Sequence, residues 1–316
     1  MPKALTYSGS WEGIRKFILD ETEIIKIYDV HEAFEGVLLE QIAIVLRKKQ
    51  NDKGKFVEVQ YVDLPYTKNV IGKHKVDTKL FNNDMFPIYS FESNEKLKQK
   101  ISENTRLLEN ISISPRGLGI QKFKYLFSDK PPSKDYKRVL IGDDVKKYGF
   151  KKESYLPYTR EEFKTYEDRI KELDAEKIVV QNIVAQTGNR LVIIANYDNQ
   201  KSITLDTVNN IIINDKEFNP KYVLGVLNSK LAEYYSFNFI FNRAVRTMHF
   251  ETVRKLPIKI LSEPKQQIVI DLVDKVLKED PDSDKAKEIR EKIDKEIYSI
   301  YQLNPKQIEM IEDSYE

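Results

Sequence analysis

The sequence contains no cysteine and only three histidines, His31, His74 and His249. The absence of cysteine excludes disulfides, cysteine-ligated zinc sites and thiol nucleophiles, and it is typical of the reducing cytoplasm, where we expect this chain to act. The histidine spacing matches no common metal-ligand pattern, so we expect no metal site. No Ser–His–Asp arrangement is credible with so few histidines, and no glycine-rich phosphate loop follows an expected strand. These absences predict a chain without a catalytic site of its own.

Long apolar runs are missing as well. No stretch reaches the roughly 18 consecutive apolar residues that a bilayer-spanning helix needs. The first residues, "MPKALTYSGSWEG", lack the apolar core of a signal peptide. We therefore expect no membrane partner. With 41% hydrophobic and 32% charged residues over 316 positions, the composition is that of a globular protein large enough for two or three domains.

The net charge of +2 hides an uneven distribution along the chain. Between Arg116 and Arg160, 12 Lys and Arg stand against 5 Asp and Glu, a local charge of +7. From Glu263 to the end, 9 Lys and Arg stand against 15 Asp and Glu, a local charge of −6. A basic middle segment indicates a polyanionic partner. The alternative is a lysine-rich surface that reflects only the base composition of the genome, and charge alone leaves both open.

The first 50 residues predict a helix followed by two strands. Residues 10–20 predict a short amphipathic helix with Ile14, Phe17 and Ile18 on one face, and the β-branched runs at 24–30 and 40–49 predict strands. This order is typical of the closing end of a Rossmann-like α/β sheet, which needs several more βα units to be complete. The polar stretch "QNDKGK" that follows predicts a domain boundary, which places the first domain at residues 1–52.

Residues 53–262 predict a mixed, strand-rich domain. "EKIVVQNIVAQTGNRLVIIANYD" predicts a hairpin of two apolar β runs joined by "QTGNR". "PKYVLGVLNSKLAEYYSFNFIF" predicts a long buried helix from about Lys221, in which the small polar Asn228 and Ser229 meet a neighbouring element while Lys230 and Glu233 face water. Residues 263–316 predict a helical hairpin with a short third helix, because apolar side chains recur at helical spacing. These are Ile268, Leu272, Val273 and Val276 in the first helix, and Ala286, Ile289, Ile293, Ile297 and Ile300 in the second.

Five stretches follow one another in the order found in gamma-class adenine DNA methyltransferases and type IIG-like restriction-modification enzymes. "WEGIRKFILDETEIIKIYDVHEAFEGVLLEQIAIVLRK" resembles the end of their catalytic domain. "ISISPRGLGIQKF", "YKRVLIGDDVKKYGF" and "EKIVVQNI" with "GNRLVIIANYD" are similar to blocks of the TaqI-like C-terminal specificity domain, and "YVLGVLNSKLAEYYSF" with "FETVRKLPI" resembles its closing helix and strand. "EIREKIDKEIYSIYQLNPKQIEMIED" resembles the helical tail of type II restriction-modification enzymes. Each block alone is weakly specific, so their order across nearly the whole chain carries the resemblance.

The resemblance implies an α/β (α+β) fold with three parts: terminal elements of a Rossmann-like methyltransferase sheet (1–52), a target-recognition domain (53–262) and a helical tail (263–316). The family holds a flipped adenine in an Asn/Asp-Pro-Pro-Tyr/Phe loop and binds S-adenosylmethionine with an early glycine-rich motif. Neither motif is present here, since "KPPS" at 130–133 lacks both flanking residue types. The resemblance therefore predicts sequence-specific recognition of double-stranded DNA, no catalytic residue and no cofactor in this chain, and S-adenosylmethionine only in a missing catalytic half.

The expected DNA contacts fall into two groups, because phosphate contacts position a protein while base contacts specify a sequence. The flexible cations suited to phosphates are Lys122, Lys124, Lys137, Arg138, Lys146, Lys147, Lys151 and Lys152. The side chains suited to base edges are the arginines Arg116, Arg190, Arg243 and Arg246, which can pair with guanine, and Gln186, Asn189 and Asn242, which suit adenine. For "QTGNR", a turn that needs Gly and Asn for backbone geometry alone is an equally good interpretation.

Partners other than DNA are also predicted. Residues 1–50 would expose a strand edge, which predicts either a separately encoded methyltransferase half or self-association. The acidic tail predicts contact with a nuclease module. Two competing functions remain open at this point: a protein-interaction or structural remnant that does not bind DNA, and a stand-alone endonuclease that uses the "DAEK" stretch (174–177) with Glu176 as its essential acid.

Overall fold

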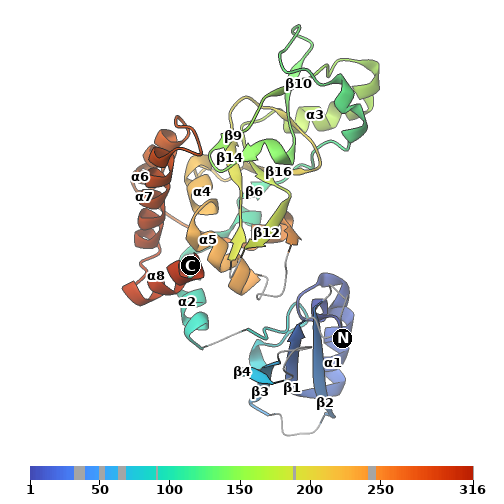
Figure 1. Ribbon diagram of the computed structural model, residues 1–316, viewed down its shortest axis with the longest axis vertical. Coiled ribbons are helices and arrows are strands. Elements are labelled where there is room, and N and C mark those ends of the chain that lie inside the picture. The colour runs from blue at the N-terminus through green and yellow to red at the C-terminus, as the bar shows by residue number, and fades with distance from the viewer. Residues whose placement is uncertain are drawn as a thin grey trace. The chain divides into compact units, whose positions relative to one another are not determined.

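The computed structural model describes residues 1–31, 40–49, 54–62, 69–89, 92–187, 190–240 and 247–315. These residues belong to two compact units (Figure 1). The first covers Met1–Lys98, and the second runs from Gln99 to Ile240 and continues from residue 247 to the C-terminus. Strands and helices are mixed in both units, which confirms the expected α/β (α+β) class.

The first unit is built on one four-stranded sheet in the order β2-β1-β3-β4. The strands are β1 (Thr22–His31), β2 (Gln41–Lys48), β3 (Phe56–Val62) and β4 (Val70–Asp77). β1 runs antiparallel to β2 and parallel to β3, and β3 runs antiparallel to β4. α1 (Glu12–Glu21) packs against β1, after the 3₁₀ turns η1 (Lys3–Thr6) and η2 (Gly9–Trp11), and η3 (Thr78–Leu80) follows β4. The helix and both strands expected in residues 10–49 are present.

The boundary expected at residues 52–53 lies inside this sheet, between β2 and β3. The parallel pairing of β1 with β3, which places Ile27 opposite Val59, makes both strands parts of one core. The polar residues around position 52 therefore connect two strands of a single sheet, and the compact unit extends to Lys98. The helix also differs from expectation, because Ile18 is buried whereas Ile14 and Phe17 are exposed by 44% and 62%.

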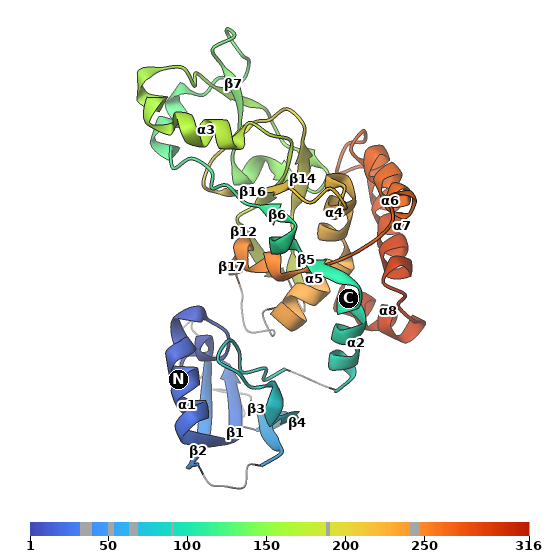
Figure 2. The same ribbon diagram turned by 180° about the vertical axis from the view of Figure 1, so that it is seen from behind.

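The second unit contains several small sheets flanked by helices (Figure 2). Its strands are β5 (Thr105–Leu107), β6 (Ser112–Ile113), β7 (Lys137–Leu140), β8 (Val145–Lys146), β9 (Gly149–Phe150), β10 (Ser154–Leu156), β11 (Lys177–Gln181), β12 (Ile183–Thr187), β13 (Arg190–Val192), β14 (Ala195–Asp198), β15 (Ile203–Thr204), β16 (Val208–Ile213), β17 (Thr247–His249) and β18 (Pro257–Lys259). They form sheets in the orders β14-β11-β16-β6, β13-β12-β17 and β10-β7-β15, with the pairs β18-β5 and β8-β9.

The helices of this unit follow or separate the sheets. They are α2 (Glu92–Ser102), in which the division between the units falls, α3 (Glu167–Leu173), α4 (Pro220–Leu227), α5 (Lys230–Tyr235), α6 (Glu263–Val276), α7 (Asp284–Ile300) and α8 (Pro305–Glu312). Shorter turns are η4 (Leu108–Asn110), η5 (Gln121–Leu126), η6 (Gly142–Asp144), η7 (Glu161–Tyr166), the π-helical η8 (Ser236–Ile240), η9 (Phe250–Lys255) and η10 (Asp313–Tyr315). Among the described residues, no helix has both the length and the apolarity needed to cross a bilayer.

The C-terminal helices form the expected helical hairpin with a third short helix. α6 and α7 lie side by side, and α6 packs on α4 (Figure 1). The contact between α4 and α6 depends on Gly225, because a Cβ there would lie 2.5 Å from a methyl group of Val269. α7 buries Ala286, Ile289, Ile293 and Ile297, the periodic residues that predicted it. α6 differs from expectation at Ile268, which is 50% exposed while Val269 faces the core.

Candidate nucleic-acid interface

Three strands bring the two segments expected to carry base contacts to one place. β12 is the central strand of the sheet β13-β12-β17 and is antiparallel to both neighbours. Thr187 pairs with Arg190 across the hairpin, and Ala185 pairs with Thr247 on the other side. The end of β12 and the beginnings of β13 and β17 therefore lie at the same end of the sheet. We call this the readout end.

Two of the residues that were expected to contact bases lie on the strands of the readout end. Gln186 and Arg190 lie on the paired strands there, although their side chains are outside the described part of the structure. Asn189, Asn242, Arg243 and Arg246 lie outside the described residues, in the segments 188–189 and 241–246 that join the chain to these strands. The expected hairpin is thus confirmed, whereas the base contacts stay predictions. Arg116 is exposed and lies elsewhere, where its backbone bridges to Asn209 of β16.

The polar triplet Asn228-Ser229-Lys230 interrupts the helix that the sequence predicts as continuous. α4 ends at Leu227 with Asn228 as its C-cap, and α5 begins after Ser229. The Ser229 hydroxyl accepts a hydrogen bond from the Ala232 backbone N–H at 3.2 Å, the usual arrangement of a serine N-cap. The two short helices therefore meet at a capped break.

The Asn228 side chain binds the backbone of β14, the strand that follows β13 along the chain. Its Oδ1 accepts from the Ala195 N–H at 3.0 Å and its Nδ2 donates to the Ala195 carbonyl at 2.9 Å. The buried carboxamide thus satisfies both polar groups of one residue of β14, as a neighbouring strand would. This contact confirms that Asn228 meets a neighbouring element, and it fixes the start of β14 against α4.

Glu233 is fully buried, which contradicts the expectation that it faces water. Its carboxylate accepts from the Ile193 N–H at 3.0 Å, from Lys147 Nζ at 2.6 Å and from the Tyr315 hydroxyl at 2.6 Å. Lys230 is only partly exposed and forms an ion pair with Glu312. A buried carboxylate needs such partners because an uncompensated charge inside a protein is costly. Asn228 and Glu233 together hold the segment between β13 and β14, so the readout end stands on a rigid support.

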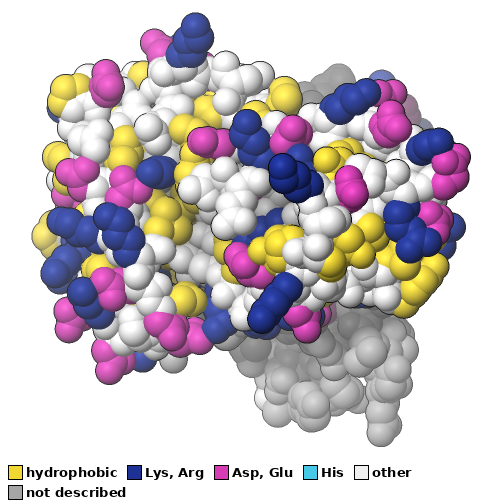
Figure 3. Space-filling view, turned by 90° about the horizontal axis from the view of Figure 1, so that it is seen from above, with side chains coloured by type: hydrophobic (Ala, Val, Ile, Leu, Met, Phe, Trp, Pro, Cys, Tyr) yellow, Lys and Arg dark blue, Asp and Glu magenta, His cyan; other side chains and the backbone are white. Residues whose placement is uncertain are grey.

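The eight cations expected at phosphates divide into two sets of four. Lys137, Lys146 and Lys147 form ion pairs with Asp174, Asp282 and Glu233. Arg138 is 6% exposed, lies 4.2 Å from the Phe150 ring centroid and pairs with Glu153 at 3.4 Å, so its charge is already balanced within the fold. The exposed members are Lys122, Lys124, Lys151 and Lys152. On the face seen in Figure 3, basic and acidic side chains are interspersed, so the excess charge of the segment does not gather into one uninterrupted patch there.

One family of known proteins is similar to the part of the chain that contains the readout end. Residues 137–258, which include all three strands of the readout sheet, match the family model described as the TaqI-like C-terminal specificity domain. Over this segment the chain is similar to TaqI-like specificity domains. No curated protein matches the sequence.

Solved structures of restriction-modification enzymes resemble the chain at low sequence identity. The Type IIL restriction-modification enzyme MmeI, solved in complex with DNA, shares a fold with 99% of this chain and 48% of its own, at 11% identity and a TM-score of 0.54. The type IIG restriction endonuclease BpuSI (12% identity, 97% of this chain, 47% of its own) and DrdV, solved as a DNA complex (9%, 87% and 37%), give TM-scores of 0.42. The chain thus spans about half the length of MmeI.

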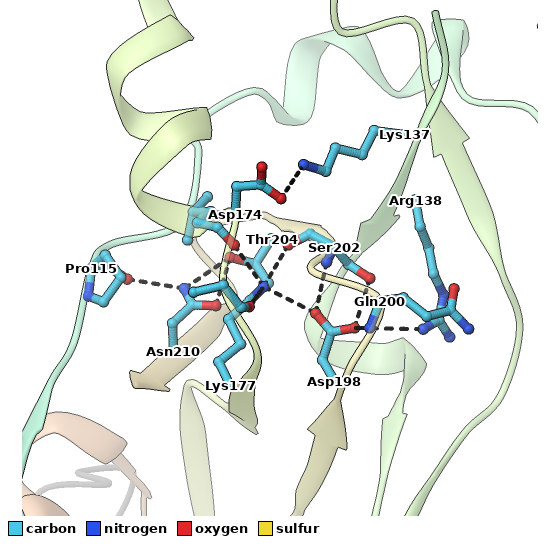
Figure 4. Close-up of polar contacts among 12 residues, drawn as sticks. Pro115, Lys137, Arg138, Asp174, Lys177, Asp198, Gln200, Ser202, Thr204 and Asn210 are labelled. Atoms are coloured by element: carbon cyan, nitrogen blue, oxygen red, sulfur yellow. Dashed lines mark hydrogen bonds and ion pairs between the residues drawn. The ribbon is translucent and has the colours of Figure 1, made fainter. Parts of the chain in front are cut away.

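A buried ion pair lies inside the segment 137–258 (Figure 4). Lys177 and Asp198 are both fully buried, with Nζ 3.0 Å from the carboxylate. Lys177 also donates to the carbonyls of Leu173, Ala175 and Ser202, and Asp198 accepts from the Ser202 N–H at 2.7 Å. Burial lowers the pKa of Lys177, and the neighbouring Asp198 opposes that shift. The cluster ties the end of α3 to β11, β14 and β15.

The buried ion pair includes a residue of the "DAEK" stretch, which the endonuclease alternative requires as a catalytic segment. Asp174 pairs with Lys137 at 2.7 Å, Glu176 accepts a hydrogen bond from the Tyr197 hydroxyl, and Lys177 is enclosed with Asp198. Within the described part of the chain, no group of three His, Cys, Asp or Glu side chains is arranged to hold a metal ion. The described contacts of this stretch are those of a structural element.

Asp294 is a buried carboxyl group of the second unit whose hydrogen bond and nearby lysines do not fully offset the effect of burial on its pKa. Asp294 of α7 is 8% exposed, and its Oδ1 accepts from the Lys230 N–H at 2.8 Å. Burial raises the pKa of Asp294 to about 6, although this hydrogen bond and the nearby Lys147 and Lys230 act in the opposite direction. Asp294 lines a cavity of about 560 Å³ together with Asn228 and Tyr315, next to the support of the specificity domain.

Proposed function

We propose that this chain recognises a specific sequence in double-stranded DNA for a restriction-modification protein acting in the cytoplasm. The observation that carries the proposal is the match of residues 137–258 to a specificity-domain family, since this segment contains the whole readout sheet. The fold shared with MmeI, whose structure was determined with DNA, supports the same function.

In this proposal, base recognition takes place at the readout end. Arg190 and Gln186 on the strands, with Asn189, Asn242, Arg243 and Arg246 in the adjoining segments, present the side-chain types that pair with guanine and adenine edges in the major groove. The exposed lysines contribute the phosphate contacts, which position the protein without reading sequence. In this proposal, Asn228 and Glu233 hold the hairpin in one conformation before DNA binds. A hairpin that is already ordered loses less conformational entropy on binding, so less of the binding free energy is offset.

We further propose that DNA modification needs a second component that binds S-adenosylmethionine and carries the catalytic residues. The outer edge of β2 is the docking position for it, or for a second copy of the chain. Residues 1–3 pair with the beginning of β2, while Val45 and Leu46 further along this edge strand are exposed by 43% and 41%. An apolar strand edge of this kind is a ready template for another strand. Val45→Lys is expected to abolish the association without affecting DNA binding.

Selection of bound duplexes from a random-sequence DNA pool at moderate salt tests the proposed function. An enriched motif is the expected result, because base-edge contacts discriminate by about 1–3 kcal/mol per pair. Uniform recovery or none contradicts the proposal and favours a protein-interaction role. Nicking of the pool that requires a metal ion and is lost in Glu176→Ala would instead favour the endonuclease.

The same selection with Arg190→Ala tests the position of the readout. We expect the variant to lose preference at one base position, while its overall affinity falls by about 1–3 kcal/mol. The matched control is Arg169→Ala, which removes an exposed arginine of α3 that forms an ion pair with Glu172 on its own helix. An unchanged motif in Arg190→Ala would exclude this hairpin as a base reader.

A further inference from the structure

A short 3₁₀ segment before the specificity-domain match presents one tyrosine to the solvent. In η5, Phe123 packs edge-on against Phe163 with ring centroids 5.1 Å apart, and Leu126 packs against the same core. Tyr125 lies between these anchors, and 75% of its surface is exposed. It is thus a large aromatic side chain held outward by a backbone that is fixed on both sides.

The surroundings of Tyr125 are basic. Lys122 and Lys124 are exposed on the same turn, with Lys122 Nζ 4.9 Å from the Phe123 ring centroid. Arg160 is not counted with them, because its guanidinium is already paired with the Glu162 carboxylate at 2.7 Å. We call Lys122, Lys124 and Tyr125 the tyrosine ridge.

An exposed aromatic ring among cations favours one kind of ligand. A lone exposed tyrosine is common and needs no explanation on its own. A rigid ring between flexible cations, however, combines the two features by which proteins hold nucleic acid: a stacking surface for bases and point charges for the flanking phosphates. A protein partner would need acidic groups opposite these cations. It would also find a single apolar side chain, Tyr125, on the tyrosine ridge, which is little apolar surface for a protein contact.

We propose that Tyr125 stacks on a base of the bound DNA, with Lys122 and Lys124 at the adjacent phosphates. The inference rests on the proposed DNA recognition and extends it to a residue outside the matched segment 137–258. In this arrangement Tyr125 contributes affinity, and at a displaced or unpaired base it contributes most, because stacking there does not compete with a neighbouring base.

The test measures binding of short duplexes that carry the fluorescent base 2-aminopurine at successive positions of the selected sequence. Wild type is expected to change the fluorescence at one position through contact with Tyr125. Tyr125→Ala should abolish that local change and raise the Kd by about 5- to 150-fold, the range expected for one base–aromatic stack. Tyr125→Phe and Tyr125→Trp should retain both, because each keeps an aromatic face.

The control is Ile268→Ala, which truncates another half-exposed large side chain, on the acidic α6. It should leave the Kd and the fluorescence unchanged. Tyr125→Ala should unfold at the wild-type temperature, because its side chain is not part of the core. If wild type binds and Tyr125→Ala binds equally well, or if Tyr125→Phe fails like Tyr125→Ala, the stacking role is excluded while DNA recognition stands. If wild type binds none of the duplexes, the proposed function itself fails.

Discussion

Two lysines, Lys177 and Lys124, have opposite surroundings in this protein. Lys177 is fully enclosed, balanced by Asp198 and bonded to three carbonyls, whereas Lys124 is exposed on the tyrosine ridge. The first holds strands of the second unit together from inside, and the second leaves its charge on the surface. Within the basic segment, Lys137, Lys146 and Lys147 are likewise paired with carboxylates, so the local charge of that segment overstates the charge available to a polyanion.

The largest effect is expected where a buried pair is broken. Lys177→Met removes the cation 3.0 Å from the buried Asp198 carboxylate and leaves it the more distant Arg138 at 3.8 Å, so the free energy of unfolding should fall by about 3–5 kcal/mol. Urea denaturation measures it, with Lys124→Met as the matched control that should change stability by less than about 0.5 kcal/mol. Equal effects of the two substitutions would contradict the division into structural and available cations.

Removing the Asn228 carboxamide should have the next largest effect. Asn228→Ala leaves the Ala195 N–H without the partner described here, while the Ala195 carbonyl still accepts from the Tyr148 N–H at 3.1 Å, so the free energy of unfolding should fall by about 1–3 kcal/mol. The exposed Asn199 provides the control, since Asn199→Ala should be nearly neutral in the same urea titration. We also expect Asn228→Ala to weaken the sequence preference, because β14 continues the readout hairpin. A neutral Asn228→Ala would mean that solvent replaces the lost contacts.

The buried Asp294 should make the stability of the protein depend on pH. Its folded-state pKa of about 6 lies above that of an unfolded aspartate, so its stabilising contribution is complete below the unfolded pKa and is lost as the pH rises through about 6. Wild type should therefore lose on the order of 1–2 kcal/mol relative to Asp294→Asn between pH 5 and pH 7. The measurement is urea denaturation of both proteins across this range. Parallel pH profiles would show that Asp294 is already ionised at pH 5.

The smallest expected effect is on the salt dependence of DNA binding, which should differ between the exposed and the ion-paired cations. Lys124→Gln should reduce the slope of log Kd against log salt by about one unit, because one phosphate contact is lost, and should leave stability unchanged. Lys147→Gln should leave the slope unchanged and lower stability, because Glu233 loses its cation. DNA titrations at several salt concentrations measure the slopes. A reversed pattern would assign the phosphate contacts to the paired lysines.

Local patterns predicted the elements whose determinants are also local. The β-branched runs around "QTGNR" predicted a hairpin that the structure confirms, and the spacing of Ile289, Ile293 and Ile297 predicted α7. The same reasoning failed at Glu233, because the groups that bury it come from Ile193, Lys147 and Tyr315, between 40 and 86 residues away in the sequence. No pattern near Glu233 reports those partners.

The sequence predicted which residue types the candidate site would contain, but not which segments the fold would bring together. Residue types suggested that the segments around Arg190 and Arg243 read bases, but only the strand order β13-β12-β17 brings their attachment points together. Likewise, the parallel pairing of Ile27 with Val59 joins segments that a polar stretch separates in the sequence, so the first unit extends beyond the expected boundary. Tyr125 was not singled out, because exposure is a property of the folded surface, whereas its lysine neighbours were visible from charge.

The strand order of the readout sheet also has a consequence for how this protein can change. Residues 188–189 connect β12 to β13, and the side chains that support the chain after β13 bind main-chain groups of Ile193 and Ala195. Such hydrogen bonds do not depend on which side chains stand at positions 188–189. Under the proposed function, substitutions at the hairpin tip can therefore change target preference while the supporting hydrogen bonds stay in place.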